Sequence, residues 1–140
     1  HLIRQKIIVA IDALPLPPKT ARRVILYLPE SELHELGLLF YRYVIKRDGY
    51  RTYYLGQTVP YVDVKAVSEV HRPDFIITSF TSTPTPQAMQ GYVDRLCQEL
   101  YPAKILASGY ALKKATIAKP SNMFIFYNAL GLRDLIKTLH

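Results

Sequence analysis

The stretch Val24-Ile25-Leu26-Tyr27-Leu28, followed closely by Glu32-Leu33-His34-Glu35-Leu36-Gly37, decides how the chain is expected to fold. Its first half is a short apolar, β-rich run, which predicts a strand. Its second half places an acid, a histidine and a glycine in the turn that follows. In an open α/β sheet that turn lies at the carboxyl edge, where ligands bind. The stretch therefore predicts a strand with a polar site beside its end.

Short β-rich runs and helical patterns alternate along the rest of the chain. The predicted strands cover residues 24–28, 51–55, 75–79, 104–107 and 123–127. The predicted helices cover residues 36–47, 62–70, 86–100 and 130–139, with a weak helix or loop before Pro120. Five βα units imply a parallel sheet with right-handed crossovers. We therefore predict an α/β fold, a flavodoxin-like doubly wound five-stranded parallel sheet with helices on both faces.

A different pattern precedes the predicted sheet. Apolar residues recur there at spacings of four, three and four, which predicts an amphipathic helix. They are Ile3, Ile7, Ala10 and Leu14. Three prolines between residues 15 and 18 then stop the helix and form a stiff connector. We expect residues 1–18 to be the end of an upstream helical bundle plus a linker, and residues 19–140 to form the domain proper.

Composition narrows the class of protein. The 140 residues are 49% hydrophobic, enough for one domain with a sizeable core. No apolar run approaches the ~20 residues of a membrane span, and no signal-peptide pattern begins the chain, so we expect a cytoplasmic protein with no membrane partner. The net charge of +7 suits an anionic partner, but the cations are scattered and no nucleic-acid motif accompanies them. The single cysteine, Cys97, is expected to be a buried structural thiol.

Hydroxyl-bearing and small residues follow the third and fourth predicted strands. The third strand leads into Ser79-Phe80-Thr81-Ser82-Thr83-Pro84-Thr85, which carries five hydroxyls in seven residues, more than a tight turn needs. Ser79 and Thr81 lie near enough to the sheet edge to donate to a buried polar ligand. The fourth strand leads into Ala107-Ser108-Gly109-Tyr110, where small residues let a ligand or backbone approach closely.

Other residues near strand ends have a simpler interpretation. Thr85 and Asn128 each precede a predicted helix, where a short polar side chain is typical of an N-cap. The dinucleotide, nucleoside-triphosphate and nucleophile-elbow motifs are absent. Position 38 is leucine, which excludes the zinc-protease motif that His34-Glu35 would begin.

Taken together, the strand ends resemble the cobalamin-binding domain family, whose pattern is D-x-H-x-x-G, then S-x-L, then G-G. The chain has Glu32 to Gly37, Ser79-Phe80-Thr81 and Ser108-Gly109 in the same order within residues 22–140. The glutamate version of the first motif looks most like the C-terminal sensory domain of light-responsive MerR-type repressors of the CarH and LitR group.

This resemblance implies a cofactor site. His34 would displace the cofactor's own dimethylbenzimidazole and bind cobalt from below, with Glu32 holding the second ring nitrogen. The nucleotide tail would lie in a slot between the Ser79 and Gly109 edges. A valine at Gly109 is then expected to exclude the tail without disturbing the fold. The expected cofactor-binding residues are Glu32, His34, Leu36, Gly37, Ser79, Thr81, Thr83, Ser108, Gly109, Tyr110 and Asn128, with His34 as metal ligand.

Three residues depart from the family pattern. Thr81 replaces the usual leucine, Ser108 replaces the first glycine, and Phe80 places a bulky ring in the central position. Ser108 is expected to crowd the slot for the tail.

The leading hypothesis is a non-catalytic sensory domain that binds adenosylcobalamin or methylcobalamin. It would control homo-oligomerisation, and so DNA binding by a missing N-terminal domain. The alternatives are the cobalamin-carrier module of a mutase or methyltransferase, and a degenerate interaction module that binds no cofactor.

Overall fold

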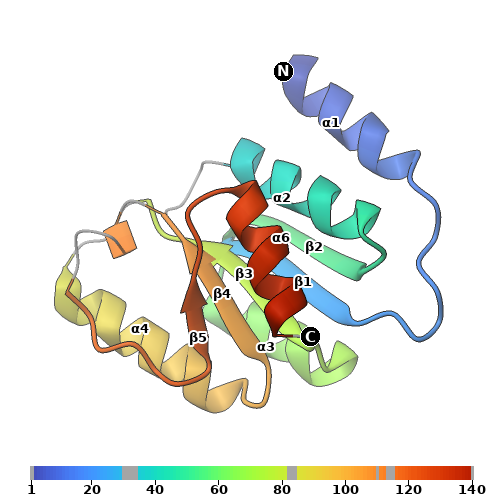
Figure 1. Cartoon of the computed structure of the whole chain (residues 1–140). Coiled ribbons are helices and arrows are strands. Elements are labelled where there is room, and N and C mark those ends of the chain that lie inside the picture. Colours follow the sequence, from blue (N-terminus) through green and yellow to red (C-terminus); the bar gives the residue numbers. More distant parts are fainter. Residues whose placement is uncertain (1, 30–34, 82–84, 110, 113–115, 140) are drawn as a thin grey trace.

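The computed structural model describes residues 2–29, 35–81, 85–109, 111–112 and 116–139, and Figure 1 shows the arrangement of their helices and strands. In chain order the elements are α1 (Leu2–Asp12), β1 (Arg23–Pro29), α2 (Glu35–Arg47), β2 (Arg51–Val59), α3 (Tyr61–His71), β3 (Phe75–Ser79), α4 (Pro86–Glu99), β4 (Lys104–Ser108), β5 (Met123–Ile125) and α6 (Ala129–Thr138).

The five strands form one parallel sheet in the order β2-β1-β3-β4-β5. The first strand, β1, lies inside the sheet. The chain then places β2 on one side of β1 and the strands β3, β4 and β5 on the other side. This is the flavodoxin-like order, in which the direction of winding reverses between β1 and β3. The predicted fold class is confirmed, and the reversal marks the carboxyl edge beside β1 and β3 as the place for a ligand.

Alternating side chains of β1 explain why both faces of the sheet are covered. Val24, Leu26 and Leu28 belong to the core beneath α2 and α6. Ile25 and Tyr27 belong to the core beneath α3 and α4. Because successive side chains of a strand point to opposite faces, an unbroken apolar run of this kind needs helices on both sides, and Figure 1 shows them there.

The second and fifth strands differ in length from their predicted ranges. β2 continues four residues beyond the predicted end at Leu55. Leu26 pairs with Tyr54 and Tyr27 with Gly56, so Leu55 is an extra residue in a bulge. Gly56 ends the β-rich run from which the strand was predicted. At φ +88°, however, this glycine lets the strand resume after the bulge. β5 ends at Ile125, two residues early, because the chain turns toward the N-cap of α6.

The N-terminal helix α1 packs on α2, as Figure 1 shows. Arg4 Nε donates to Glu35 Oε1 at 2.6 Å near one end of the contact, and Lys46 Nζ donates to the carbonyl of Ile11 at 3.1 Å near the other. The predicted apolar stripe is partly wrong. Ile3 and Ala10 are exposed, whereas Ile11 is buried. The packed face therefore includes Ile11, because the amphipathic phase of the helix is shifted by one residue.

None of the described helices is long and apolar enough to cross a membrane.

Cys97 lies on the buried face of α4, as expected of a structural thiol. Burial, and secondarily the nearby Asp94 carboxylate, raises the pKa of the Cys97 thiol to about 11. The thiolate is the reactive form, so the folded protein is expected to resist alkylation by iodoacetamide at pH 8 and to react once unfolded in urea. Mass spectrometry of the two samples checks this, and rapid labelling of the folded protein would contradict the burial.

Candidate functional site

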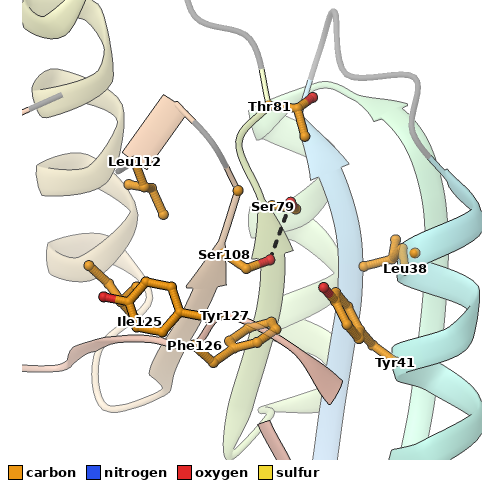
Figure 2. A pocket seen from close by; sticks show the side chains of 11 residues that line it. Leu38, Tyr41, Ser79, Thr81, Ser108, Leu112, Ile125, Phe126 and Tyr127 are labelled. Carbon is orange, nitrogen blue, oxygen red and sulfur yellow. Dashed lines mark hydrogen bonds between the residues drawn. The ribbon is translucent and has the colours of Figure 1, made fainter. Parts of the chain in front are cut away.

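A cavity of about 540 Å³ opens at the carboxyl edge of the sheet, between α2 and the segment that follows β5. Its volume lies in the range of small-molecule sites. Figure 2 shows the side chains around it. The lining residues are Gly37, Leu38, Tyr41, Ser79, Thr81, Ser108, Gly109, Leu112, Ile125, Phe126 and Tyr127.

Five of the predicted site residues meet at this cavity although they come from three separate segments. They are Gly37, Ser79, Thr81, Ser108 and Gly109. Their role in binding a cofactor stays a prediction, but their convergence follows from the parallel order of β3 and β4 beside β1. Leu36 is 42% exposed and lies outside the lining.

Four predicted site residues lie outside the described part of the chain. They are Glu32, His34, Thr83 and Tyr110. Within the described part, no group of three or more histidine, cysteine, aspartate or glutamate side chains could hold a metal ion.

Asn128 and Thr85 serve as helix caps. The Asn128 side chain accepts a hydrogen bond from the Gly131 amide at 2.7 Å, at the start of α6. The Thr85 hydroxyl accepts one from the Ala88 amide at 3.0 Å, at the start of α4. Both predicted caps are confirmed, while the cofactor contact of Asn128 stays a prediction.

Ser79 and Ser108 form a hydroxyl pair at the edge of the sheet. The Ser108 hydroxyl donates to Ser79 Oγ at 3.3 Å, between the last residues of β3 and β4 (Figure 2). Ser108 is only 4% exposed. The hydroxyl that replaces the family's usual glycine is therefore tied to the neighbouring strand and is part of the cavity wall.

Ser79 and Gly109 both line the cavity, but the backbone of Gly109 itself packs against the backbone of Phe80. The Phe80 amide donates to the Ser108 carbonyl at 2.8 Å, and the Ala111 amide donates to the Phe80 carbonyl at 2.9 Å. A Cβ added to Gly109 would lie 2.2 Å from the Phe80 oxygen. The small residue at Gly109 thus admits the Phe80 backbone, and the open space lies beside this contact, toward α2.

This contact corrects the expectation that a valine at Gly109 would leave the fold undisturbed. Gly109 has φ +115°, a conformation that disfavours side chains, and it faces main-chain atoms that cannot rotate away. We therefore expect a substitution at Gly109 to destabilise the fold, whatever its effect on ligand binding.

Phe80 does not fill the cavity. Its ring is buried in the core beneath α3 and α4 and packs edge to face with Tyr92, with ring centroids 5.7 Å apart. Ser79 and Thr81, on either side in sequence, line the cavity. The bulky departure from the family motif is therefore accommodated on the opposite face of the sheet.

Sequence reasoning missed six lining residues, all of them large and largely apolar. They are Leu38, Tyr41, Leu112, Ile125, Phe126 and Tyr127. Tyr41 could have been predicted to line the site, because it lies four residues after Gly37 and therefore on the same face of the helix. Its ring meets Phe126 edge to face at 5.1 Å. That contact joins α2 to the segment after β5, which no local pattern reveals.

The first residue of α2, Glu35, is held by α1 and lies beside β2. Arg4 of α1 is its partner at 2.6 Å, and the Tyr54 phenol of β2 is its neighbour. Burial, followed by the charge of Glu35, raises the pKa of Tyr54 well above its ordinary value. The phenol therefore stays protonated, and Glu35 anchors the start of the helix that contributes Gly37 and Tyr41 to the cavity.

Sequence comparison relates the chain to a bacterial repressor. No protein-family model matches it. It is 27% identical over 113 residues to the HTH-type transcriptional repressor CarA of Myxococcus xanthus, a match that covers 81% of this chain. The chain spans about two fifths of the repressor, 39% of its length.

Solved structures share the fold at lower identity. A cobalamin-binding protein from Desulfitobacterium hafniense superposes with a TM-score of 0.70 at 18% identity, over 86% of this chain and 60% of that one. The methanol:cobalamin methyltransferase complex MtaBC of Methanosarcina barkeri superposes with a TM-score of 0.74 at 20% identity, over 87% of this chain and 47% of that one. The monomethylamine corrinoid protein of the same organism superposes with a TM-score of 0.68 at 18% identity, over 87% of this chain and 59% of that one. The predicted resemblance is thus confirmed: the chain is similar in sequence to a transcriptional repressor and in fold to cobalamin-binding proteins.

Proposed function

We propose that this chain is the cobalamin-binding sensory domain of a MerR-type transcriptional regulator. Bound adenosylcobalamin or methylcobalamin controls homo-oligomerisation, and thereby DNA binding by a domain outside this chain. The observation that carries the proposal is the cavity at the winding reversal of the sheet, where Gly37, Ser79 and Ser108 come together. The similarity to a transcriptional repressor over 81% of the chain supports the regulatory role.

The described residues fit the nucleotide tail of cobalamin. A Cβ added to Gly37 would meet no heavy atom within 4 Å, so the backbone of α2 leaves open space at the cavity. The Tyr41 and Phe126 rings offer apolar surface for a planar base, and Ser79 offers a hydroxyl. A volume of about 540 Å³ suits this tail, whereas the much larger corrin ring would remain outside the edge.

We assign cobalt coordination to His34. A carboxylate two residues earlier, Glu32, can accept the ring proton and leave the other imidazole nitrogen for the metal. Imidazole is a suitable ligand for a transition metal of this kind. The bound cofactor would supply a cobalt centre whose upper ligand can change, and light is the input that the CarH and LitR resemblance suggests.

A second candidate function is cofactor delivery within a methyltransferase or mutase. The fold likeness to the methanol:cobalamin methyltransferase complex favours it. In both candidates the domain itself catalyses nothing, because the cofactor or a separate domain does the chemistry. Sequence similarity to a repressor favours the regulator.

Absorption spectra test cofactor binding. The purified chain, titrated in the dark with adenosylcobalamin and methylcobalamin, is expected to shift each spectrum to the form in which the cofactor's own base has left cobalt. Spectra that match free cofactor up to high concentration would remove the proposed function.

Size-exclusion chromatography of the full-length protein then tests the regulatory step. The cofactor-bound protein is expected to change oligomeric state on illumination. Identical elution in dark and light would remove the light-sensing version and leave a light-independent sensor.

A further inference from the structure

Five hydroxyl-bearing side chains line the cavity: Tyr41, Ser79, Thr81, Ser108 and Tyr127. Thr81 and Tyr127 are engaged in other interactions, and the remaining three hydroxyls come from three elements. Tyr41 comes from α2, Ser79 from the end of β3 and Ser108 from the end of β4. Figure 2 shows the phenol oxygen of Tyr41 directed toward the space beside the Ser79–Ser108 pair. A cavity lined elsewhere by Leu38, Phe126 and other apolar side chains thus has a polar side that includes these three hydroxyls.

Two of these hydroxyls have protons to donate to a ligand. Ser108 donates to Ser79 Oγ, which fixes Ser79 as the acceptor of that bond and leaves its own proton without an acceptor among the described residues. The Tyr41 hydroxyl likewise has no hydrogen-bond partner in the described part of the chain; its ring is held by Phe126. Tyr41 and Ser79 are half-buried, and an occupant of the cavity would cover them. Donors that a ligand covers and leaves unpaired cost binding free energy. The occupant of the cavity should therefore present more than one acceptor to this side.

We infer that, among corrinoid cofactors, the cavity selects one whose lower base is a purine such as adenine over one whose base is dimethylbenzimidazole. This inference rests on the proposed function. Once detached from cobalt, dimethylbenzimidazole has a single ring nitrogen able to accept a hydrogen bond, and its far edge carries two methyl groups. Adenine presents several ring nitrogens and an amino group. Dimethylbenzimidazole can therefore pair with at most one of the Tyr41 and Ser79 donors, whereas the purine can pair with both.

The aromatic wall does not make this distinction. Tyr41 and Phe126 provide ring surface that either base can contact, since both bases are planar aromatic systems. Discrimination must then come from the hydroxyls. A site that hydrogen-bonds its ligand strongly rejects an analogue that lacks the matching polar groups, because the groups of the site are then left unpaired. An apolar site rejects an analogue with an extra polar group less strongly.

Calorimetric titration of the 140-residue chain with three corrinoids tests the inference. The probes are cobalamin, its adenine-base analogue, and cobinamide, which lacks the nucleotide tail. The adenine analogue is expected to bind about tenfold more tightly than cobalamin, as one additional hydrogen bond implies. Cobinamide is expected to bind most weakly, because it leaves the cavity without a base.

The variant Tyr41→Phe isolates the hydroxyl. It keeps the ring and its contact with Phe126, so the fold is preserved, and it is expected to remove most of the preference for adenine. Ser79→Ala is expected to reduce the same preference. Tyr43→Phe is the matched control, because Tyr43 lies on the same helix, contacts Arg47 and does not line the cavity. It should leave the preference unchanged.

The outcomes separate this inference from the function on which it rests. If cobalamin and its adenine analogue bind equally, the base selection is wrong and corrinoid binding stands. If Tyr41→Phe and Ser79→Ala both keep the preference, these hydroxyls do not select the base, and the inference that the cavity selects it through them is wrong. If cobinamide binds as tightly as both, the cavity does not hold the base, and the inference is again wrong. If none of the three binds, the proposed function fails and takes this inference with it.

Discussion

Replacing His34 with alanine is expected to weaken cobalamin binding by at least about tenfold, since losing even a group that only orients a metal ligand costs about that much. The variant should also leave the cofactor's own base on cobalt, because no imidazole competes for that position. Absorption spectroscopy reports the coordination state, and calorimetry reports the affinity. Both changes together would assign the lower ligand.

A second histidine provides the control. His71 ends α3 at the opposite, amino edge of the sheet, where its carbonyl accepts a hydrogen bond from Arg23 at the start of β1. His71→Ala is expected to bind cobalamin as the parent does. If His34→Ala keeps the parent spectrum and affinity, cobalt coordination by His34 is wrong, whatever the cavity holds.

The sheet could be predicted because its information is local. Each strand is a short apolar run between turn residues, and the alternation with helices restricts the topology to a parallel, doubly wound sheet. The sites at strand ends could be predicted for the same reason, since parallel strands present their carboxyl ends at one edge. That argument, together with the family resemblance, predicted Gly37, Ser79 and Ser108 as site residues, and all three line the cavity.

What the sequence could not supply depends on contacts between distant segments. Tyr41 and Phe126 meet edge to face in the cavity wall, although they are 85 positions apart in the chain, because α2 and the segment after β5 pack on the same face of the sheet. The phase of α1 was misjudged for a similar reason. Its spacing fits more than one apolar stripe, and only packing against α2 selects the face that contains Ile11.

Gly109→Ala is expected to destabilise the protein by about 3 kcal/mol, an effect in the range of backbone strain combined with a steric clash. The new Cβ would lie 2.2 Å from the Phe80 oxygen, and the residue would have to keep φ +115°. The Phe80 backbone cannot retreat easily, because its amide and carbonyl are hydrogen-bonded to Ser108 and Ala111. Urea denaturation followed by circular dichroism measures the loss.

Gly37→Ala is the matched control, because it adds the same methyl group at another residue of the same cavity. A Cβ at Gly37 meets nothing within 4 Å, and alanine is favoured over glycine inside a helix by up to about 1 kcal/mol. This variant should therefore be as stable as the parent or slightly more so. If Gly109→Ala unfolds at the parent's urea midpoint, the close contact with Phe80 is wrong. If it is destabilised as expected, a loss of cofactor binding on substitution of Gly109 reports a distorted strand end and not a blocked nucleotide tail, so tail placement must be judged from Tyr41 and Ser79.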